Sequence, residues 1–287
     1  MTAPNLFLVA APRAGSTQLA HWLASHPDIA LSPVKEPTHF AAHDFPEDYV
    51  RATHLNDVDP ARYRPGRPAQ FAVFRERADY LRLFSGMTQR WRCDASTSYL
   101  ACPEAPAAIR AAFPDARVLT LTRAPLDRAL SHYGLARRTG RTRAPLGSEL
   151  DDELAGRTPL PARFLLRPSR QAPGVARVAA EFGTAHLPLR FEDMVADPRA
   201  TLERIARFLD LDPGGFDPGA GARNAVASPR LPALNAALHR SGTKTWLRRH
   251  LPAALKPALR AAWFHDAPPH VSPAEIARLA RALEATE

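Results

Sequence analysis

The chain has 287 residues, of which 45% are hydrophobic, so it is long enough to bury the core of one large α/β domain or two small ones. Its net charge of +9 favours anionic ligands, with nucleic acid as the rival partner, but the sequence holds no zinc-finger spacing, aromatic RNA-binding motif or basic heptad region. The apolar run near the N-terminus is too short for a signal segment or a membrane span, and Cys93 and Cys102 offer no disulfide framework. We therefore expect a cytoplasmic protein with no membrane span and no nucleic-acid partner.

Strand and helix patterns alternate along the chain. Short apolar runs predict strands over 5–11, 28–31, 90–95, 117–122 and 187–190. A loop that carries Glu36 follows the second strand. Apolar spacing and end signals predict helices over 16–26, 71–84, 103–112, 125–138, 172–182 and 198–209, and a terminal cover over 273–283.

This alternation is typical of a three-layer α/β fold, with a central parallel sheet covered on both faces and ligands at the carboxyl ends of the strands. No composition shift or internal repeat marks a boundary, so residues 1–287 are predicted to form a single domain.

The segment after the first strand, residues 12–17 (PRAGST), predicts a phosphate cradle. Gly15 lets the backbone approach an anion closely. Ser16 or Thr17 can cap the helix that follows, and the N-terminus of that helix favours a phosphate.

The same segment fails the nucleoside-triphosphate pattern G-x-x-x-x-G-K-[ST] at two positions. Ala10 stands where the first glycine should be, and Ser16 stands where the lysine should be. The strand over 117–122 ends at Arg123 instead of at an aspartate that could hold magnesium. The cradle is therefore P-loop-like but suited to a phosphate without a metal.

Residues 12–17 resemble the first signature, P-[KR]-[SAT]-G-[ST]-[ST], of sulfotransferases that use 3′-phosphoadenosine 5′-phosphosulfate (PAPS). The second signature of that family is a strand that ends in arginine, then a helix with a serine eight residues on, as at Arg123 and Ser131. The resemblance implies that Arg123 and Ser131 clamp the 3′-phosphate that distinguishes PAPS from ATP. It also implies that the donor's 5′-phosphate is bound by Arg13, Ala14, Gly15, Ser16, Thr17 and Gln18.

Two further segments extend the resemblance. Residues 35–40 (KEPTHF) are similar to a K-E-x-x-[HY]-F stretch in which the glutamate is taken as the general base, and residues 189–194 (LRFEDM) are similar to a late strand and helix of the family. The resemblance thus implies that Glu36 takes the acceptor's proton as it attacks sulfur in line, while Arg13 offsets charge on the departing oxygen. A sulfuryl group carries less charge than a phosphoryl group, so we expect no metal.

The chain departs from the family in its acceptor region. Residues 94–99 (DASTSY) replace an E-x-[ST]-P-x-Y pattern, and the R-K-G-x-x-G loop of the small-phenol branch is absent, with residues 240–244 (RSGTK) as the nearest candidate. This absence favours a carbohydrate or lipid acceptor. His39 and Asp94 are candidates for acceptor binding; the alternative is a structural role for His39 and a strand-end cap for Asp94.

Two other functions compete with this interpretation. A nucleoside or small-molecule kinase would share the cradle but should have a P-loop lysine and a magnesium carboxylate. A non-catalytic nucleotide-binding relative would keep the binding motifs, and Glu36 argues against it. The acceptor itself should be bound by variable loops, expected over 40–70, 139–170 and after 214, whose shape and oligomeric context one sequence does not define.

Overall fold

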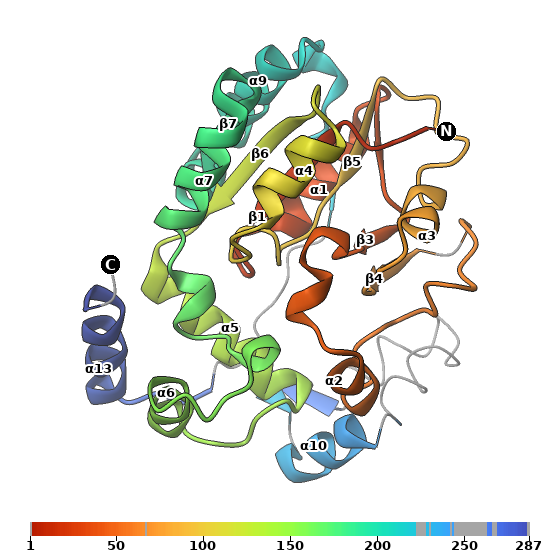
Figure 1. Ribbon diagram of the computed structural model, residues 1–287. Coiled ribbons are helices and arrows are strands. Elements are labelled where there is room, and N and C mark those ends of the chain that lie inside the picture. Colours follow the sequence, from red (N-terminus) through yellow and green to blue (C-terminus); the bar gives the residue numbers. More distant parts are fainter. Residues whose placement is uncertain are drawn as a thin grey trace.

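The computed structural model describes residues 2–66, 68–221, 228–229, 231–241, 243, 263–265 and 269–285. A five-stranded sheet in the order β2-β5-β1-β6-β7 forms its centre (Figure 1). The strands are β1 (Leu6–Ala10), β2 (Ile29–Leu31), β5 (Trp91–Asp94), β6 (Arg117–Thr122) and β7 (His186–Arg190). All neighbouring strands in this sheet are parallel, so their carboxyl ends lie together at one end of the sheet.

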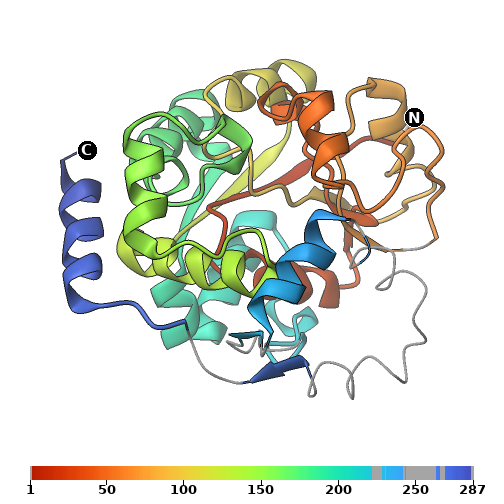
Figure 2. The same ribbon diagram turned by 90° about the horizontal axis from the view of Figure 1, so that it is seen from below.

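Helices cover both faces of this sheet. α1 (Ser16–Ser25) and α9 (Pro198–Leu209) pack on one face, and α4 (Ala105–Ala112) and α7 (Ala172–Phe182) pack together on the other (Figure 2). The middle strand β1 is buried along its whole length, as expected for a parallel strand between two helical layers. The predicted three-layer α/β fold with a central parallel sheet is confirmed.

A second, two-stranded parallel sheet consists of β3 (Val34–Glu36) and β4 (Ala69–Phe71). Two expectations from the sequence are wrong here. Glu36 ends a strand instead of lying in a loop, and the helix expected over 71–84 is shorter, because α3 spans only Arg77–Arg82. The apolar residues that suggested one continuous helix, such as Phe74 and Phe84, pack around Tyr80 in a separate small cluster.

Three further helices pack against one another. They are α5 (Pro125–Thr139), α6 (Leu146–Leu154) and α13 (Pro273–Glu284). The three helices share a hydrophobic cluster that includes Tyr133, Leu150 and Leu279. Glu275 closes a capping box at the start of α13 and also accepts a hydrogen bond from the backbone N–H of Gly147 in α6. The terminal helix is confirmed, whereas α6 lies in the segment 139–170, for which the sequence suggests only a loop.

The remaining elements are short. They are the helices α2 (Glu47–Ala52), α8 (Phe191–Ala196) and α10 (Pro232–Arg240), the 3-10 turns η1 (His39–Asp44), η2 (Leu160–Ala162), η3 (Arg167–Ser169), η4 (Gly183–Ala185) and η5 (Pro213–Gly215), and the antiparallel pair β8 (Ser228–Pro229) and β9 (Phe264–His265). In the described ranges, no helix combines the length and the apolar character needed to cross a membrane. Within the candidate loop 240–244, positions 242 and 244 lie outside the described residues, as does much of the segment after 221.

Candidate functional site

The loop between β1 and α1 has the backbone of an anion cradle. Gly15 is the N-cap of α1 with φ 90°, and no side chain caps the helix, so the expected cap by Ser16 or Thr17 is wrong. The uncapped N–H groups of the first helical turn therefore remain suited to an anion. The N–H of Ala14 differs from them, because it donates to the carbonyl of Ala11 at 3.1 Å.

Only glycine fits at position 15. A Cβ built there would lie 2.7 Å from both Met194 Cε and Phe191 Cδ2, two residues of α8. The left-handed backbone adds a second reason, because L side chains rarely adopt it. Residues 189–194, which resemble the late strand and helix of the family, thus pack directly on the phosphate loop.

The side chain of Arg13 joins the two segments that resemble donor-binding signatures. Its Nε donates to Ser131 Oγ at 3.1 Å, although the two residues are 118 positions apart. Arg13 itself has a left-handed backbone with φ 74°, a conformation that non-glycine residues adopt mainly where function or packing requires it. Burial, followed by the nearby charges of Arg138 and Arg123, lowers the pKa of Arg13 to about 10. The guanidinium stays positive at neutral pH, and a bound anion would relieve this repulsion.

Arg123 lies against the same loop. Its Nη1 donates to the carbonyl of Arg13 at 3.1 Å, and its guanidinium lies 4.5 Å from the centre of the Phe191 ring. The side chain of Gln171 fixes the backbone of Arg123 from both sides, since it accepts from the N–H at 2.9 Å and donates to the carbonyl at 2.7 Å. Nothing in the sequence marked Gln171, because its role depends on contacts 48 residues away.

Arg128, which was not singled out from the sequence, contacts the backbone of the phosphate loop. It is fully buried in α5, and its Nη1 donates to the carbonyl of Pro12 at 3.2 Å. Its Nε donates to Ser169 Oγ at 2.8 Å, and burial lowers the pKa of Arg128 to about 9. Burial and the charge of Arg128 together push the pKa of His132 well below its usual value, so this packed imidazole is neutral. In the sequence, an arginine four residues before a histidine on the expected helix 125–138 was the only sign of this pair.

Glu36 ends β3 with its carboxylate held by three donors. Oε1 accepts from Lys35 Nζ at 3.0 Å and from Gln70 Nε2 at 3.2 Å, and Oε2 accepts from Thr97 Oγ1 at 2.6 Å. Lys35 Nζ also lies 3.5 Å from Ser16 Oγ, so this lysine connects the carboxylate to the phosphate loop. Lys35, Gln70 and Thr97 are site residues that sequence reasoning missed, although Lys35 stands within the matched segment 35–40.

His39 and Asp94, the two candidates for acceptor binding, have different surroundings. His39 Nδ1 pairs with the carbonyl of Phe74 at 2.8 Å, and the ring stacks on Tyr80 with centroids 4.3 Å apart. Burial lowers the pKa of His39, which keeps the ring neutral at pH 7. One face of the His39 ring is therefore covered by Tyr80.

Asp94 is fully buried and lies behind the site instead of in it. Its carboxylate accepts hydrogen bonds from the hydroxyls of Tyr80, Tyr99 and Ser96 at 2.7–2.8 Å. Ser96 Oγ also accepts from the N–H of Thr38, two residues after Glu36. Burial raises the pKa of Asp94 to about 6 despite these donors. A carboxylate enclosed in this way has no open face for an acceptor, and its contacts brace the chain after Glu36.

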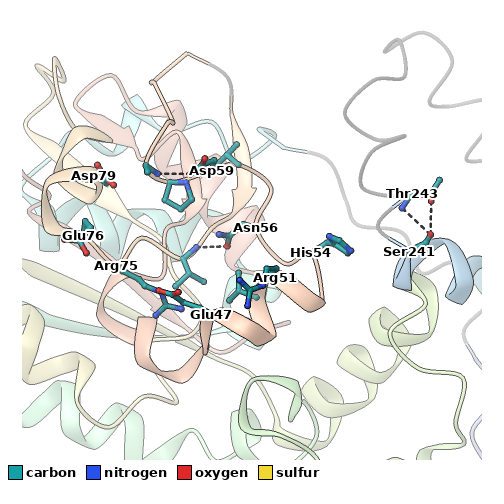
Figure 3. A pocket seen from close by; sticks show the side chains of 15 residues that line it. Glu47, Arg51, His54, Asn56, Asp59, Arg75, Glu76, Asp79, Ser241 and Thr243 are labelled. Carbon is teal, nitrogen blue, oxygen red and sulfur yellow. Dashed lines mark hydrogen bonds and ion pairs between the residues drawn. The ribbon is translucent and has the colours of Figure 1, made fainter.

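A cavity of about 1100 Å³ lies beside the segment that runs from α2 to α3 (Figure 3). Its lining combines charged and polar side chains with apolar ones such as Val50, Val58 and Val73. Glu47, Arg51, His54, Asn56, Asp59, Arg75, Glu76 and Asp79 line it from this segment, and Ser241 and Thr243 line it from the end of α10. Arg13, Glu36 and Arg123 are not in its lining, so the cavity is separate from the basic centre.

The chain is similar to known sulfotransferases in sequence and in fold. A family model described as "Sulfotransferase family" matches residues 4–216. The crystal structure of a sulfotransferase from Alicyclobacillus acidocaldarius superposes with a TM-score of 0.65 at 25% sequence identity, covering 89% of this chain and 100% of that one. A sulfotransferase domain from the Synechococcus PCC 7002 olefin synthase gives 0.47 at 20% identity, covering 99% and 96% of the two chains.

A mouse sulfotransferase, SULT7A1, solved as a complex with PAP, gives a TM-score of 0.45 at 16% identity and covers 88% of this chain and 69% of that one. A comparison with curated proteins finds no match. The family model spans well over half of the chain and includes the phosphate loop, Glu36 and the Arg123 to Ser131 segment. This chain therefore belongs to the sulfotransferase family.

Proposed function

We propose that this protein transfers a sulfuryl group from PAPS to a hydroxyl or amine of a carbohydrate or lipid acceptor. The observation that carries the proposal is the convergence of Arg13, Arg123 and Ser131 at the N-terminus of α1. Arg13 Nε donates to Ser131 Oγ, and Arg123 Nη1 donates to the carbonyl of Arg13. Two segments more than 100 residues apart in sequence thus form one basic centre.

The residues of this centre fit a nucleotide with phosphates at both the 5′ and 3′ positions. The N–H groups of Gly15 to Gln18, at the uncapped start of α1, suit the 5′-phosphate. Arg123 and Ser131 supply a guanidinium and a hydroxyl for the 3′-phosphate. Support comes from solved relatives that hold this kind of ligand, since the mouse enzyme is complexed with PAP and a retinol dehydratase is complexed with androsterone and the inactive cofactor PAP.

The transfer step needs one base and one cation. The acceptor oxygen or nitrogen forms a bond to sulfur as the bond from sulfur to the bridging phosphate oxygen breaks, and the acceptor proton passes to the Glu36 carboxylate. Arg13 offsets the charge that develops on the departing oxygen. Lys35 lies between Glu36 and Ser16, where it can orient the base toward the reacting group.

The acceptor is proposed to enter from the cavity beside α2 and α3. Its lining carries charged groups, for example Glu47, Asp79 and Arg75, together with apolar side chains such as Val50 and Val73. The charged groups can hydrogen-bond to the hydroxyls of a carbohydrate, and the apolar side chains can contact an apolar part of the acceptor.

The proposal is tested by comparing two nucleotides in a thermal-shift experiment. Adenosine 3′,5′-bisphosphate should raise the Tm of the protein, whereas ATP with magnesium should raise it much less. Stabilisation by ATP and magnesium alone would favour a kinase. A screen of sugar, lipid, phenol and peptide acceptors with radiolabelled PAPS then identifies the acceptor class.

A further inference from the structure

Four side chains with metal-binding atoms meet away from the phosphate loop. His43 and Asp44 end the turn η1, and Cys102 and Glu104 lie just before α4. His43 Nε2, an Asp44 carboxylate oxygen and Cys102 Sγ all lie within 4.8 Å of one another. Glu104 Oε2 lies 3.3 Å from His43 Nε2 and 3.5 Å from Cys102 Sγ.

The distances between these atoms match the edges of a tetrahedral zinc site. Bond lengths of about 2.3 Å to sulfur and about 2.0 to 2.1 Å to nitrogen and oxygen give edges of about 3.6 Å for S to N, about 3.5 Å for S to O and about 3.3 Å for N to O. The observed separations are 3.6 Å for Cys102 Sγ to His43 Nε2, 3.5 Å for Cys102 Sγ to Glu104 Oε2 and 3.3 Å for His43 Nε2 to Glu104 Oε2. Three independent edges therefore fit one centre.

Asp44 supplies the fourth direction. Its Oδ1 lies 3.7 Å from His43 Nε2, and its Oδ2 accepts a hydrogen bond from Arg167 Nη2 at 2.7 Å. Because Arg167 holds Oδ2, the other oxygen of Asp44 is left for a cation. Ligands of metals are commonly oriented in this way by an outer-shell hydrogen bond. The Asp44 side chain is only 7% exposed, whereas His43 is 55% exposed, so the cluster is anchored inside and open to solvent on one side.

We propose that Cys102, His43, Glu104 and Asp44 form a binding site for a divalent transition metal, zinc by the preference of a thiolate, an imidazole and carboxylates. On binding, the Cys102 thiol loses its proton to solvent and the sulfur bonds to the metal. The metal is structural in this proposal, because none of its ligands belongs to the phosphate loop or contacts the Glu36 carboxylate.

The site ties η1 to the start of α4. η1 begins at His39, three residues after Glu36, and Cys102 follows the segment 94–99 that braces the chain behind Glu36. A metal held from both sides would therefore fix the turn that follows the base. Without a metal, Cys102 Sγ lies 3.6 Å from His43 Nε2 and donates to Glu104 Oε2 at 3.5 Å.

The test is a cobalt titration of the full-length protein after its metals have been removed with a chelator. We expect one Co²⁺ per chain, with a thiolate-to-cobalt charge-transfer band and visible bands of tetrahedral intensity, and we expect one equivalent of Zn²⁺ to abolish them. Zn²⁺ should also raise the Tm of the metal-free protein.

Variants separate this site from adventitious binding. Cys102→Ser should abolish the charge-transfer band, and the exposed-residue variants His43→Gln and Glu104→Gln should weaken zinc binding by more than about tenfold. Cys93→Ser, at the other buried cysteine, and His54→Gln, at a histidine of the cavity, should leave the band unchanged. A normal band in Cys102→Ser, its absence in the unmodified protein, or equal zinc affinity in His43→Gln and His54→Gln would overturn the proposal.

Discussion

At the scale of single residues, the proposed role of Glu36 as general base can be tested directly. Hydrogen bonds from Lys35, Gln70 and Thr97 fix the position of the Glu36 carboxylate. Replacement by the isosteric amide keeps the shape and removes the basicity. Glu36→Gln should therefore lower turnover by roughly two to four orders of magnitude while affinity for adenosine 3′,5′-bisphosphate stays nearly constant.

Steady-state kinetics with the acceptor found in the screen, together with calorimetry on the bisphosphate, measure the two effects. Glu181→Gln, at an exposed glutamate of α7, serves as the control and should behave as the unmodified protein. Near-normal turnover in Glu36→Gln would remove Glu36 from this role and make His39 the next candidate.

Arg13 should matter through both its charge and its contact with Ser131. Arg13→Ala should reduce turnover more than affinity for the bisphosphate product, because the contact strengthens as the leaving oxygen gains charge. Arg13→Lys should keep substantial activity, since the positive charge is retained although the planar fork is lost. Kinetics of both variants decide the point, and equally inactive variants would indicate that Arg13 only shapes the loop.

The pKa of Asp94 gives a pH prediction. A carboxyl whose pKa rises from about 4 when unfolded to about 6 when folded binds its proton more tightly in the folded state, so its contribution to stability falls as pH rises between these values. Asp94→Asn does not titrate. The unmodified protein should be the more stable of the two because the hydroxyls of Tyr80, Tyr99 and Ser96 all donate to Asp94.

The difference in unfolding free energy between the two proteins should narrow, by about 2 kcal/mol, as pH rises from 4 to 6. Urea denaturation at several pH values measures it. A difference that instead widens with pH would mean that the three hydroxyl donors outweigh burial and depress the pKa.

At the scale of elements, the structure shows a close contact between α8 and the phosphate loop that the sequence did not predict. Gly15→Ala combines an unfavourable φ of 90° with a Cβ placed 2.7 Å from Met194 and Phe191. Gly86→Ala is a matched control, because it has φ 80° and no atom within 4 Å of its Cβ.

Both variants should lose about 1 to 2 kcal/mol from the left-handed backbone, and Gly15→Ala should lose more because α8 must move. Only Gly15→Ala should lose affinity for adenosine 3′,5′-bisphosphate. Chemical denaturation measures the free energy of unfolding, and calorimetry measures affinity for the bisphosphate. Equal losses of stability in the two variants, with normal binding in Gly15→Ala, would show that α8 moves to make room for the Cβ at little cost.

The sequence predicted the elements whose signals are local. β1, β6, α5 and α7 each follow from apolar runs or helical spacing with clear ends, and they are found at the expected positions. The segment 71–84 was predicted as one helix because apolar residues from Phe71 to Phe84 keep roughly helical spacing. Phe71 instead ends the strand β4, and the helix α3 spans only Arg77–Arg82. The partner of β4, β3, lies about 35 residues away, and a pairing of this kind has no local signal.

The same distinction divides the site residues. The sequence indicated Arg13, Glu36, Arg123 and Ser131 because each stands in a segment with a recognisable pattern. Gln171, Gln70 and Thr97 have no such pattern, since their roles arise only when distant segments meet. Asp94 looked available for an acceptor because it ends a strand, but three hydroxyls from the small cluster and the following loop enclose it.

At the scale of the whole molecule, the parallel sheet explains why the site assembles. β1 and β6 are neighbours, so the loop after β1 and Arg123 after β6 leave the sheet side by side and bring Arg13 and Ser131 together. The small β3–β4 sheet then places Glu36 near the phosphate loop through Lys35. Binding of a 3′,5′-bisphosphate at this meeting point is the central claim of the proposed function.

Calorimetry on Arg123→Ala with two nucleotides tests that claim most directly. Loss of a charge-assisted contact costs ~1.5–3 kcal/mol, so the variant should bind adenosine 3′,5′-bisphosphate roughly tenfold to a hundredfold more weakly. Its affinity for adenosine 5′-monophosphate should barely change, and Arg199→Ala, at an exposed arginine of α9, should bind both nucleotides normally. Ser131→Ala should show the Arg123→Ala pattern more weakly. Equal losses for both nucleotides in Arg123→Ala would mean that Arg123 only supports the loop through the carbonyl of Arg13, and would contradict a 3′-phosphate site.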